Sequence, residues 1–513
     1  GQTYVTYLFR VTRPPRLPAP LTERPLPVAH RNAIALRFTT PIVLLAALVT
    51  TTPALKLAAQ GARRSTSNVA RLGSAMFSNP PVLRNMSSKP GTVEVSITAA
   101  PARLELVPGK ISDVYAYNGS IPGPTLEAHE GDHVIIHFHN NLSEPSTIHC
   151  HGIHLPAAMD GSPFGLVPAG GHFDYEFTLK RGTAGTYWYH PHPDLRSEYQ
   201  VTMGLAGAII VRAADDPIAS LPERVLVLSD NRFRPDGRID FPDSTSIQAE
   251  VDEENGREGN VMLVNGHVMP TLNVAPGEVQ RWRIINASAS RVYRLAIPGQ
   301  TLLQVGSDGG LLEHAVEQKD IVLASSERAE ILVRGAASGE HAELQTLPYD
   351  RYMPQTRPPD WNSPHSLVAI AYTGSPPATP VVIPAVLREI PALDPSSATA
   401  THVIVMSQGM IDGRTMDMDR VDVHTTLGAT EIWQLENVVG MDHPFHLHGF
   451  EFQVLDRNGV TEPFRSWKDV VNVPRHQTVR FIVHYTDFAG KWMFHCHILA
   501  HEDQGMMAVL EVK

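Results

Sequence analysis

Pairs of histidines separated by one residue are the feature of this sequence with the clearest chemical meaning. The chain of 513 residues contains 25 histidines. Four of the pairs stand in two distant regions: His149/His151, His190/His192, His446/His448 and His495/His497. On an extended strand, residues i and i+2 point to the same side, so each pair can direct two imidazoles at one place. Eight imidazoles are too many for one ion, but they suit a cluster of three metal ions that share two, three and three nitrogen ligands.

The cysteine inside the last pair predicts a second kind of metal site. Strand alternation turns Cys496 away from the side that His495 and His497 face. A thiolate with two imidazoles and a weak thioether ligand forms a blue-copper electron-transfer site, whereas structural zinc sites usually have several cysteines. The cluster ions are then copper as well, and electrons reach them from Cys496 across one residue of backbone. The candidate partners of Cys496 are close in sequence: His443, His501 and Met506.

The second cysteine of the chain, Cys150, lies in the middle of the first histidine pair. The same alternation turns its thiol away from the cluster. We expect a small buried thiol that packs in a core, with a redox or copper-loading role as the alternative. A disulfide between Cys150 and Cys496 would destroy the blue-copper site and is not expected.

The four motifs together resemble the copper motifs of three-domain multicopper oxidases, and they are most similar to those of bacterial laccases and the related cuprous oxidases. The resemblance covers roughly residues 93–513, and the combination is very specific. The motifs are His149-Cys-His-Gly152, Trp188-Tyr-His-Pro-His192, His443-Pro-Phe-His-Leu-His-Gly449 and His495-Cys-His-Ile-Leu-Ala-His-Glu-Asp-Gln-Gly-Met506.

The resemblance implies four copper ions and assigns their ligands by position. It also implies that Asp160 and Glu502 relay protons to bound oxygen, because reduction of dioxygen to water consumes four protons that neutral imidazoles do not supply. Met441 and Asp442, directly before His443, are candidates for substrate contact. The implied ligands are His443, Cys496, His501 and Met506 for type 1, His149 and His446 for type 2, His151, His190 and His497 for one type 3 ion, and His192, His448 and His495 for the other.

By this resemblance the chain is a laccase-like enzyme that takes single electrons from phenols or aromatic amines and reduces O2 to water. The enzymatic alternative is a metallo-oxidase that oxidises copper(I) in copper tolerance. Relatives of that kind often carry a methionine-rich insert beside the type 1 site, and no such insert is visible. The methionines at 406, 410, 416 and 418 are expected to pack in a core rather than to form a copper(I) path. The non-enzymatic alternative, a copper-free periplasmic scaffold of the same fold, predicts missing ligands, but every position is filled.

The segments that must position these residues repeat three times. Each copy contains a turn, a strand, a glycine-containing turn and a strand that ends near an asparagine. Period-2 strands and abundant Pro (42) and Gly (37) predict an all-β chain of three consecutive cupredoxin-like Greek-key β-sandwich domains. The turns are Asn118-Gly119, Asn265-Gly266 and Asp412-Gly413, and the strands end near Asn140, Asn286 and Asn437.

Composition places the domain boundaries at 93–214, 215–375 and 376–513, with the trinuclear site between domains 1 and 3. The segment from Pro348 to Ser366 is rich in Pro, Tyr and Arg, and we expect a long surface loop there. Residues 1–92 combine a basic stretch, a short apolar run at 41–49 and small residues. This order predicts a leader for export to the periplasm or the outside, followed by a flexible tether.

Charge and hydropathy restrict the partners. The net charge of −11 argues against binding to nucleic acid. The apolar run at 41–49 is too short for stable membrane insertion. The expected partners are O2 and a small reducing substrate, and the expected assembly is a monomer.

Overall fold

The structure is a computed structural model that describes residues 75–352 and 361–513. The apolar run of the expected export leader lies outside the described residues. Within them, no helix is long and apolar enough to cross a membrane.

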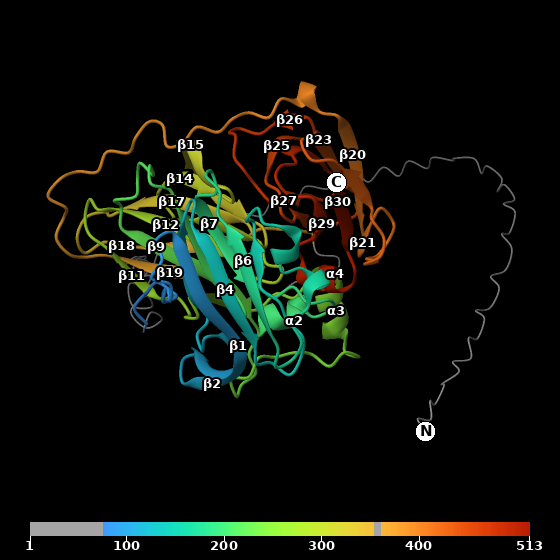
Figure 1. The fold of residues 1–513 in the computed structure, drawn as a ribbon. Helices are drawn as coiled ribbons and strands as arrows, with labels where there is room; N and C mark the ends of the chain where they lie inside the picture. Colours follow the sequence, from blue (N-terminus) through green and yellow to red (C-terminus); the bar gives the residue numbers. More distant parts are fainter. Residues whose placement is uncertain (1–74, 353–360) are drawn as a thin grey trace, which may run out of the picture. The chain divides into compact units, whose positions relative to one another are not determined.

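The strands of the first domain form two four-stranded sheets (Figure 1). The first has the order β2 (Lys110–Tyr117), β1 (Thr92–Val107), β4 (His133–Asn140), β6 (His172–Thr178). The second has the order β3 (Gly123–His129), β8 (Gly207–Arg212), β7 (Gly185–His190), β5 (His149–His151).

The second domain pairs a six-stranded sheet with a five-stranded sheet. The first has the order β10 (Val261–Val264), β9 (Glu223–Asn231), β12 (Val279–Asn286), β17 (Arg328–Arg334), β14 (Leu302–Ser307), β15 (Gly310–Gln318). The second has the order β11 (Thr271–Val274), β19 (His365–Tyr372), β18 (His341–Leu347), β13 (Tyr293–Ala296), β16 (Ile321–Leu323).

The third domain has the same arrangement of six and five strands. The first sheet has the order β21 (Met410–Ile411), β20 (Ala400–Ser407), β23 (Thr430–Asn437), β28 (Thr478–His484), β25 (Phe452–Arg457), β26 (Val460–Thr461). The second has the order β22 (Val423–Thr425), β30 (Met507–Val512), β29 (Gly490–Cys496), β24 (His443–Leu447), β27 (Val470–Val473).

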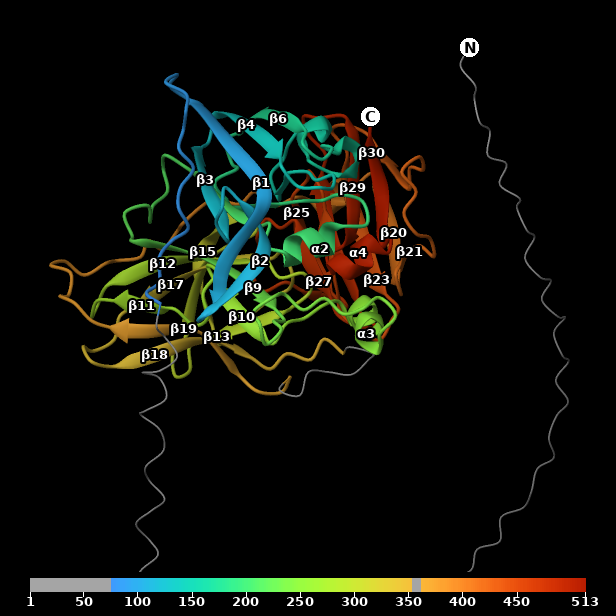
Figure 2. The same ribbon diagram turned by 90° about the horizontal axis from the view of Figure 1, so that it is seen from below.

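The helices that the structure describes are short. One α-helix comes from each domain, and the three lie side by side in both views (Figures 1 and 2). They are α2 (Ser197–Thr202), α3 (Ile247–Asn255) and α4 (Leu499–Asp503). The 3-10 helices are η1 (Ala157–Met159), η2 (Pro163–Gly165) and η3 (Pro395–Ser397).

The three domains repeat one strand topology, which confirms the predicted all-β fold of three sandwiches. In each domain a parallel pair (β1 with β4, β9 with β12, β20 with β23) is followed by an antiparallel partner. The Asn-Gly and Asp-Gly turns have positive φ at both residues, for example 50° at Asn118 and 77° at Gly119, as tight hairpin turns require. The exact domain boundaries stay a prediction.

The asparagine that ends the middle strand closes the next loop in each copy. The side-chain amide of Asn140 donates to the carbonyls of Glu144, Val167 and Pro168. Asn286 and Asn437 do the same in their domains. A buried amide that serves several loop carbonyls satisfies groups that would otherwise be unpaired, which explains why the asparagine recurs.

Residues 75–91, predicted as part of a flexible tether, are held against two domains. The backbone N–H of Phe77 donates to Thr271 O at 2.8 Å, and that of Leu83 donates to Thr125 O at 2.9 Å. The Asn79 side chain accepts from Val225 N at 2.9 Å. Because this segment satisfies free groups at the edges of β11 and β3, the expectation of a flexible tether is wrong for residues 75–91.

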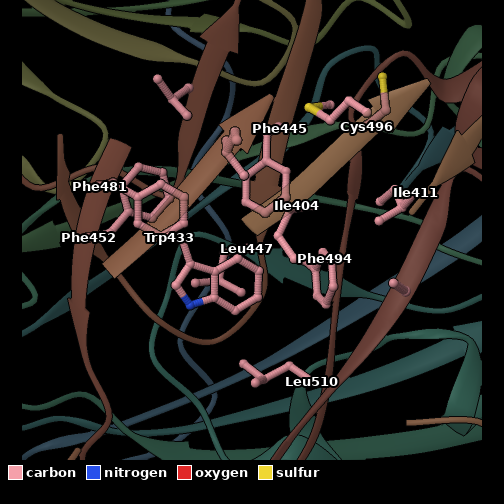
Figure 3. Packing of buried hydrophobic residues seen from close by; sticks show 14 of the residues in the cluster. Ile404, Ile411, Trp433, Phe445, Leu447, Phe452, Phe481, Phe494, Cys496 and Leu510 are labelled. Atoms are coloured by element: carbon pink, nitrogen blue, oxygen red, sulfur yellow. The ribbon is translucent and has the colours of Figure 1, made fainter. Parts of the chain in front are cut away.

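The core of domain 3 lies between its two sheets and is rich in aromatic side chains. Trp433 stacks on Phe481 with ring centroids 5.8 Å apart, and Phe452 stacks on Phe481 at 4.0 Å. Figure 3 shows Cys496 and Leu510 at opposite ends of this core. Cys496 is therefore held by close-packed neighbours on one side of its strand.

Candidate metal centres

Strands β5 and β7 present the histidines of domain 1 on one face. His149 lies opposite His190, and Cys150 lies opposite Tyr189 in the antiparallel ladder. Cys150 is buried in the domain core with Tyr175 and Tyr189. This position matches the expected packed thiol on the side away from the histidines. Both cysteines of the chain are unbridged.

Strands β24 and β29 divide the residues of domain 3 in the same way. Phe445 pairs with Cys496 and belongs with it to the hydrophobic core. The neighbouring pair, His446 and His495, lies on the opposite face. Period-2 alternation thus separates Cys496 from the two flanking histidines, as the sequence predicts.

The faces of domains 1 and 3 that carry these histidines pack against each other. His149 stacks on His448 with ring centroids 4.1 Å apart, and His151 stacks on His446 at 3.8 Å. We call these eight histidines the trinuclear site. Ligand atoms within 4.8 Å of one another occur in the groups His149/His151/His446, His151/His190/His497 and His192/His448/His495.

The hydrogen bonds of the trinuclear site fit a metal ligand set. The Nδ1 atoms of His149 and His446 lie 2.6 Å and 2.9 Å from the backbone carbonyls of Asp160 and Asp469. An imidazole that donates through Nδ1 keeps its lone pair on Nε2. Both Nε2 atoms are buried without a hydrogen-bond partner, and a bound cation would supply that missing partner.

Burial also keeps these imidazoles neutral. Desolvation lowers the pKa of His149 to about 3 and that of His495 to about 4. It lowers the pKa of His446 and His448 well below the usual range, and neighbouring histidines add to the effect. A neutral imidazole is the form that binds a metal. At ordinary pH the imidazoles of this site are therefore in the protonation state that binds a metal.

The type 1 site (His443, Cys496, His501 and Met506) is buried, and all four of its residues belong to domain 3. The Nδ1 atoms of His443 and His501 lie 3.3 Å and 3.7 Å from Cys496 Sγ. The Met506 side chain is buried in the same core, and Met506 O accepts from Cys496 N at 3.1 Å. Burial raises the pKa of the Cys496 thiol to about 12, so a cation in this site is needed to hold the sulfur as a thiolate.

Helix α3 of domain 2 covers the outer edge of the type 1 site. His501 Nε2 lies 3.1 Å from the carbonyl of Glu254, near the C-terminal end of α3. Beside it, Gln504 Nε2 donates to Glu253 O at 2.9 Å. Donation by Nε2 leaves His501 Nδ1 as the ligand atom that faces Cys496. No sequence motif predicts this contact, because α3 lies about 250 residues from His501.

Two buried acids touch the trinuclear site where the resemblance predicts relay residues. Asp160 Oδ2 lies 2.8 Å from His448 Nδ1, and burial raises its pKa to about 8. Glu502 Oε1 lies 3.4 Å from His192 Nδ1, and Oε2 lies 3.2 Å from His495 Nδ1. Burial raises the pKa of Glu502 well above its usual range. Both acids are therefore placed to exchange protons with the site.

Comparisons with known proteins identify this arrangement. Family models described as multicopper oxidase match residues 100–216, 230–357 and 389–513. A multicopper oxidase of Staphylococcus aureus is 31% identical over 450 residues, which cover 84% of this chain and 91% of that protein. The chain belongs to the multicopper oxidase family. Its metal is therefore copper, and the protein is a copper oxidoreductase.

Two solved multicopper oxidase structures resemble this one closely. The first, from Campylobacter jejuni and described as a metallo-oxidase, has a TM-score of 0.78 and 32% identity, and covers 86% of this chain and 96% of that one. The second is a laccase from Pediococcus acidilactici with a TM-score of 0.75 and 32% identity, covering 85% and 93%.

Met441 and Asp442 of this multicopper oxidase are both buried. Asp442 Oδ2 accepts from the Tyr349 hydroxyl at 2.6 Å, and Asp442 Oδ1 accepts from Arg475 N at 2.9 Å. These bonds give Asp442 a role in holding the loop before His443. Direct substrate contact by Met441 or Asp442 stays a prediction.

Asp469 is a residue of the multicopper oxidase site that sequence reasoning missed. Its Oδ1 lies 2.9 Å from His151 Nε2, and its carbonyl faces His446. The guanidinium of Arg328, from domain 2, donates to Asp469 Oδ1 at 2.9 Å. Arg328 is fully buried and ties the trinuclear site to the second domain. No His-x-His pattern marks either residue, so only the packing of the domains reveals them.

Carboxyl groups gather where α2 meets α4 of this multicopper oxidase. The Asp503 carboxylate accepts from Ser197 N and Glu198 N at 2.9 Å and 3.0 Å. Burial and the neighbouring Asp503 raise the pKa of Glu198 to about 8. One carboxyl oxygen of Glu198 is buried without a hydrogen-bond partner, so ionisation of this group disfavours the folded state.

We expect Glu198→Gln to stabilise the protein at pH 8 but not at pH 5. The folded pKa lies above the value of about 4.3 for a free glutamate, so the unfolded chain releases this proton first. Stability therefore falls as pH rises from about 4 to about 8. Thermal unfolding should show a gain of roughly 2 °C at pH 8. The control is Glu250→Gln, at an exposed position on α3. An equal gain at both pH values would rule out ionisation as the cause.

Proposed function

We propose that this protein is a laccase-type oxidase with four copper ions, bound by the ligands that the resemblance assigns. The observation that carries the proposal is the position of Cys496 on β29. Its thiol faces the type 1 site, and His495 and His497 on either side face the trinuclear site. Copper bound in these sites would take single electrons from a donor and deliver four of them to dioxygen, which yields two waters. The covalent path from Cys496 to its neighbours joins the two sites.

The residues around the trinuclear site would handle the protons of this reaction. Asp160 hydrogen-bonds His448, and Glu502 lies between His192 and His495. Each acid is buried with a raised pKa, which favours a protonated form that can donate near neutral pH. Every ligand position of the resemblance is filled, so we do not propose the copper-free scaffold.

The proposed donors are phenols and aromatic amines, and the similarity to the laccase of Pediococcus acidilactici supports this class. A metallo-oxidase that takes electrons from copper(I) is the second candidate. This candidate is favoured by the similarity to the Campylobacter jejuni metallo-oxidase. It is also favoured by the position of α3 over His501, because a small ion reaches a covered site more easily than an aromatic ring does. In addition, Met416, one of the methionines considered above for a copper(I) path, lies next to the type 1 site. It is partly buried, and its backbone N–H donates to the carbonyl of Gly505, the residue before Met506, at 2.8 Å.

Oxygen consumption with a methoxyphenol and with copper(I), each with and without excess copper(II), separates these candidates. The laccase proposal predicts turnover of the phenol by copper-loaded protein without added copper(II). If kcat/KM for copper(I) is more than tenfold higher and phenol turnover depends on added copper(II), the protein is a metallo-oxidase. Protein with full copper that consumes no oxygen with either donor would contradict both proposals.

A further inference from the structure

The segment that leaves β18 carries a buried cation of domain 2 to the type 1 site. Arg351 is 2% exposed, and its Nη1 donates to Met441 Sδ at 3.4 Å. Its carbonyl accepts from Asp442 N at 3.0 Å. The sequence predicts a long surface loop from 348 to 366, and this is wrong for Arg351. Residues 353–360 of that prediction lie outside the described residues.

The charge of Arg351 is partly balanced by Glu258. Arg351 Nε donates to Glu258 Oε1 at 2.8 Å, and Glu258 also lies 3.3 Å from Arg291 Nη2. Arg351 contacts Met441, two residues before the ligand His443, through Nη1, whereas Glu258 is bonded to Nε. The guanidinium is thus the charged group in contact with the loop that leads to His443.

We propose that Arg351 is a positioning residue that raises the reduction potential of the type 1 copper. The inference rests on the proposed function, in which His443, Cys496, His501 and Met506 hold that ion. Uptake of one electron lowers the charge of the site by one. A fixed cation nearby favours the reduced state, and burial preserves the interaction because little water or salt screens it. Domain 2 therefore makes the electron acceptor in domain 3 easier to reduce.

A purely structural role for Arg351 predicts a different pattern of effects. If the side chain only packs on Met441 and holds the loop before His443, loss of its charge changes stability but not the potential. Methionine and lysine are both long and unbranched, so they fill the space of Arg351 with and without a charge. Substitution of Glu258 removes the opposing charge and leaves Arg351 in place.

The test is a redox titration of the type 1 copper, followed by its blue colour, in copper-loaded full-length protein. In Arg351→Met we expect the oxidised-to-reduced ratio at a given potential to rise about tenfold, which corresponds to a potential lower by about 59 mV for a one-electron couple. Arg351→Lys should stay near the wild type. Glu258→Gln should shift the potential in the opposite direction, upward.

Each result has a defined meaning. An unchanged potential in a blue Arg351→Met protein overturns the proposal, and so does an equal loss in Arg351→Lys. If Arg351→Met does not fold, Glu258→Gln decides: a higher potential supports the proposal, and an unchanged or lower one overturns it. If the wild-type protein itself binds copper without becoming blue, the proposed function fails instead.

Discussion

Replacement of Cys496 by serine is expected to remove the blue colour and the oxidase activity together. Cys496 supplies the only sulfur anion available to the type 1 site among the described residues. A serine hydroxyl is a harder ligand and does not form a blue site. Loss of residues that merely orient a ligand already costs roughly 10–100-fold, so the activity should fall at least that far. Oxygen consumption and visible absorption measure the two effects.

Cys150→Ser is the matched control for this substitution. Cys150 is as deeply buried as Cys496, but it faces the core of domain 1. Its replacement should cost about 1–3 kcal/mol of stability for the buried hydroxyl and leave the colour intact. Copper content should fall by one ion per chain in the Cys496 variant alone. A blue Cys496→Ser protein, or a colourless Cys150→Ser protein, would contradict the assignment of the type 1 site.

Asp160→Asn is expected to slow oxygen reduction by roughly 100-fold or more, because removal of a proton donor from a reacting site has effects of this size. The amide of asparagine can still accept a hydrogen bond from His448 Nδ1, and the carbonyl that faces His149 is unchanged. The geometry of the ligands is therefore kept while the acidic proton is lost. Steady-state oxygen consumption gives the overall rate.

A second measurement separates the proton relay from damage to electron entry. Under anaerobic conditions the donor should bleach the blue colour of Asp160→Asn at the wild-type rate, since Asp160 does not touch the type 1 site in the structure. Asp174→Asn, at an exposed position in the same domain, is the control and should leave both rates unchanged. If bleaching slows as much as oxygen consumption, Asp160 does not act as a relay at the trinuclear site.

The local geometry of the copper motifs could be predicted because it depends on one property of extended chains. Side chains on a strand alternate in direction, so the spacing of His495, Cys496 and His497 already determines that sulfur and imidazoles face opposite sides. The ladders of β5 with β7 and of β24 with β29 show this separation. The threefold repeat could also be predicted from the sequence, because each domain needs the same turn and the same loop-closing asparagine.

The spacing of the motifs and the repeated turns do not predict the long-range contacts. Nothing in the spacing indicates that His149 stacks on His448, that Asp469 reaches His151, or that Arg351, inside the expected surface loop, is buried. Partners so far apart in the chain are brought together by the packing of whole domains, and a single sequence carries no periodic signal for that packing.

The sequence by itself therefore determined the ligand types, their division between two sites and the all-β fold, since period-2 alternation and turn residues act over a few positions. Only the tertiary structure decided that domain 2, which holds none of the predicted copper ligands, takes part in the site. It places Arg328 on Asp469, α3 over His501 and Arg351 on Met441. The physical reason is that an enclosed metal site needs its outer surfaces covered and its buried charges paired, and the groups that do this come from distant parts of the chain.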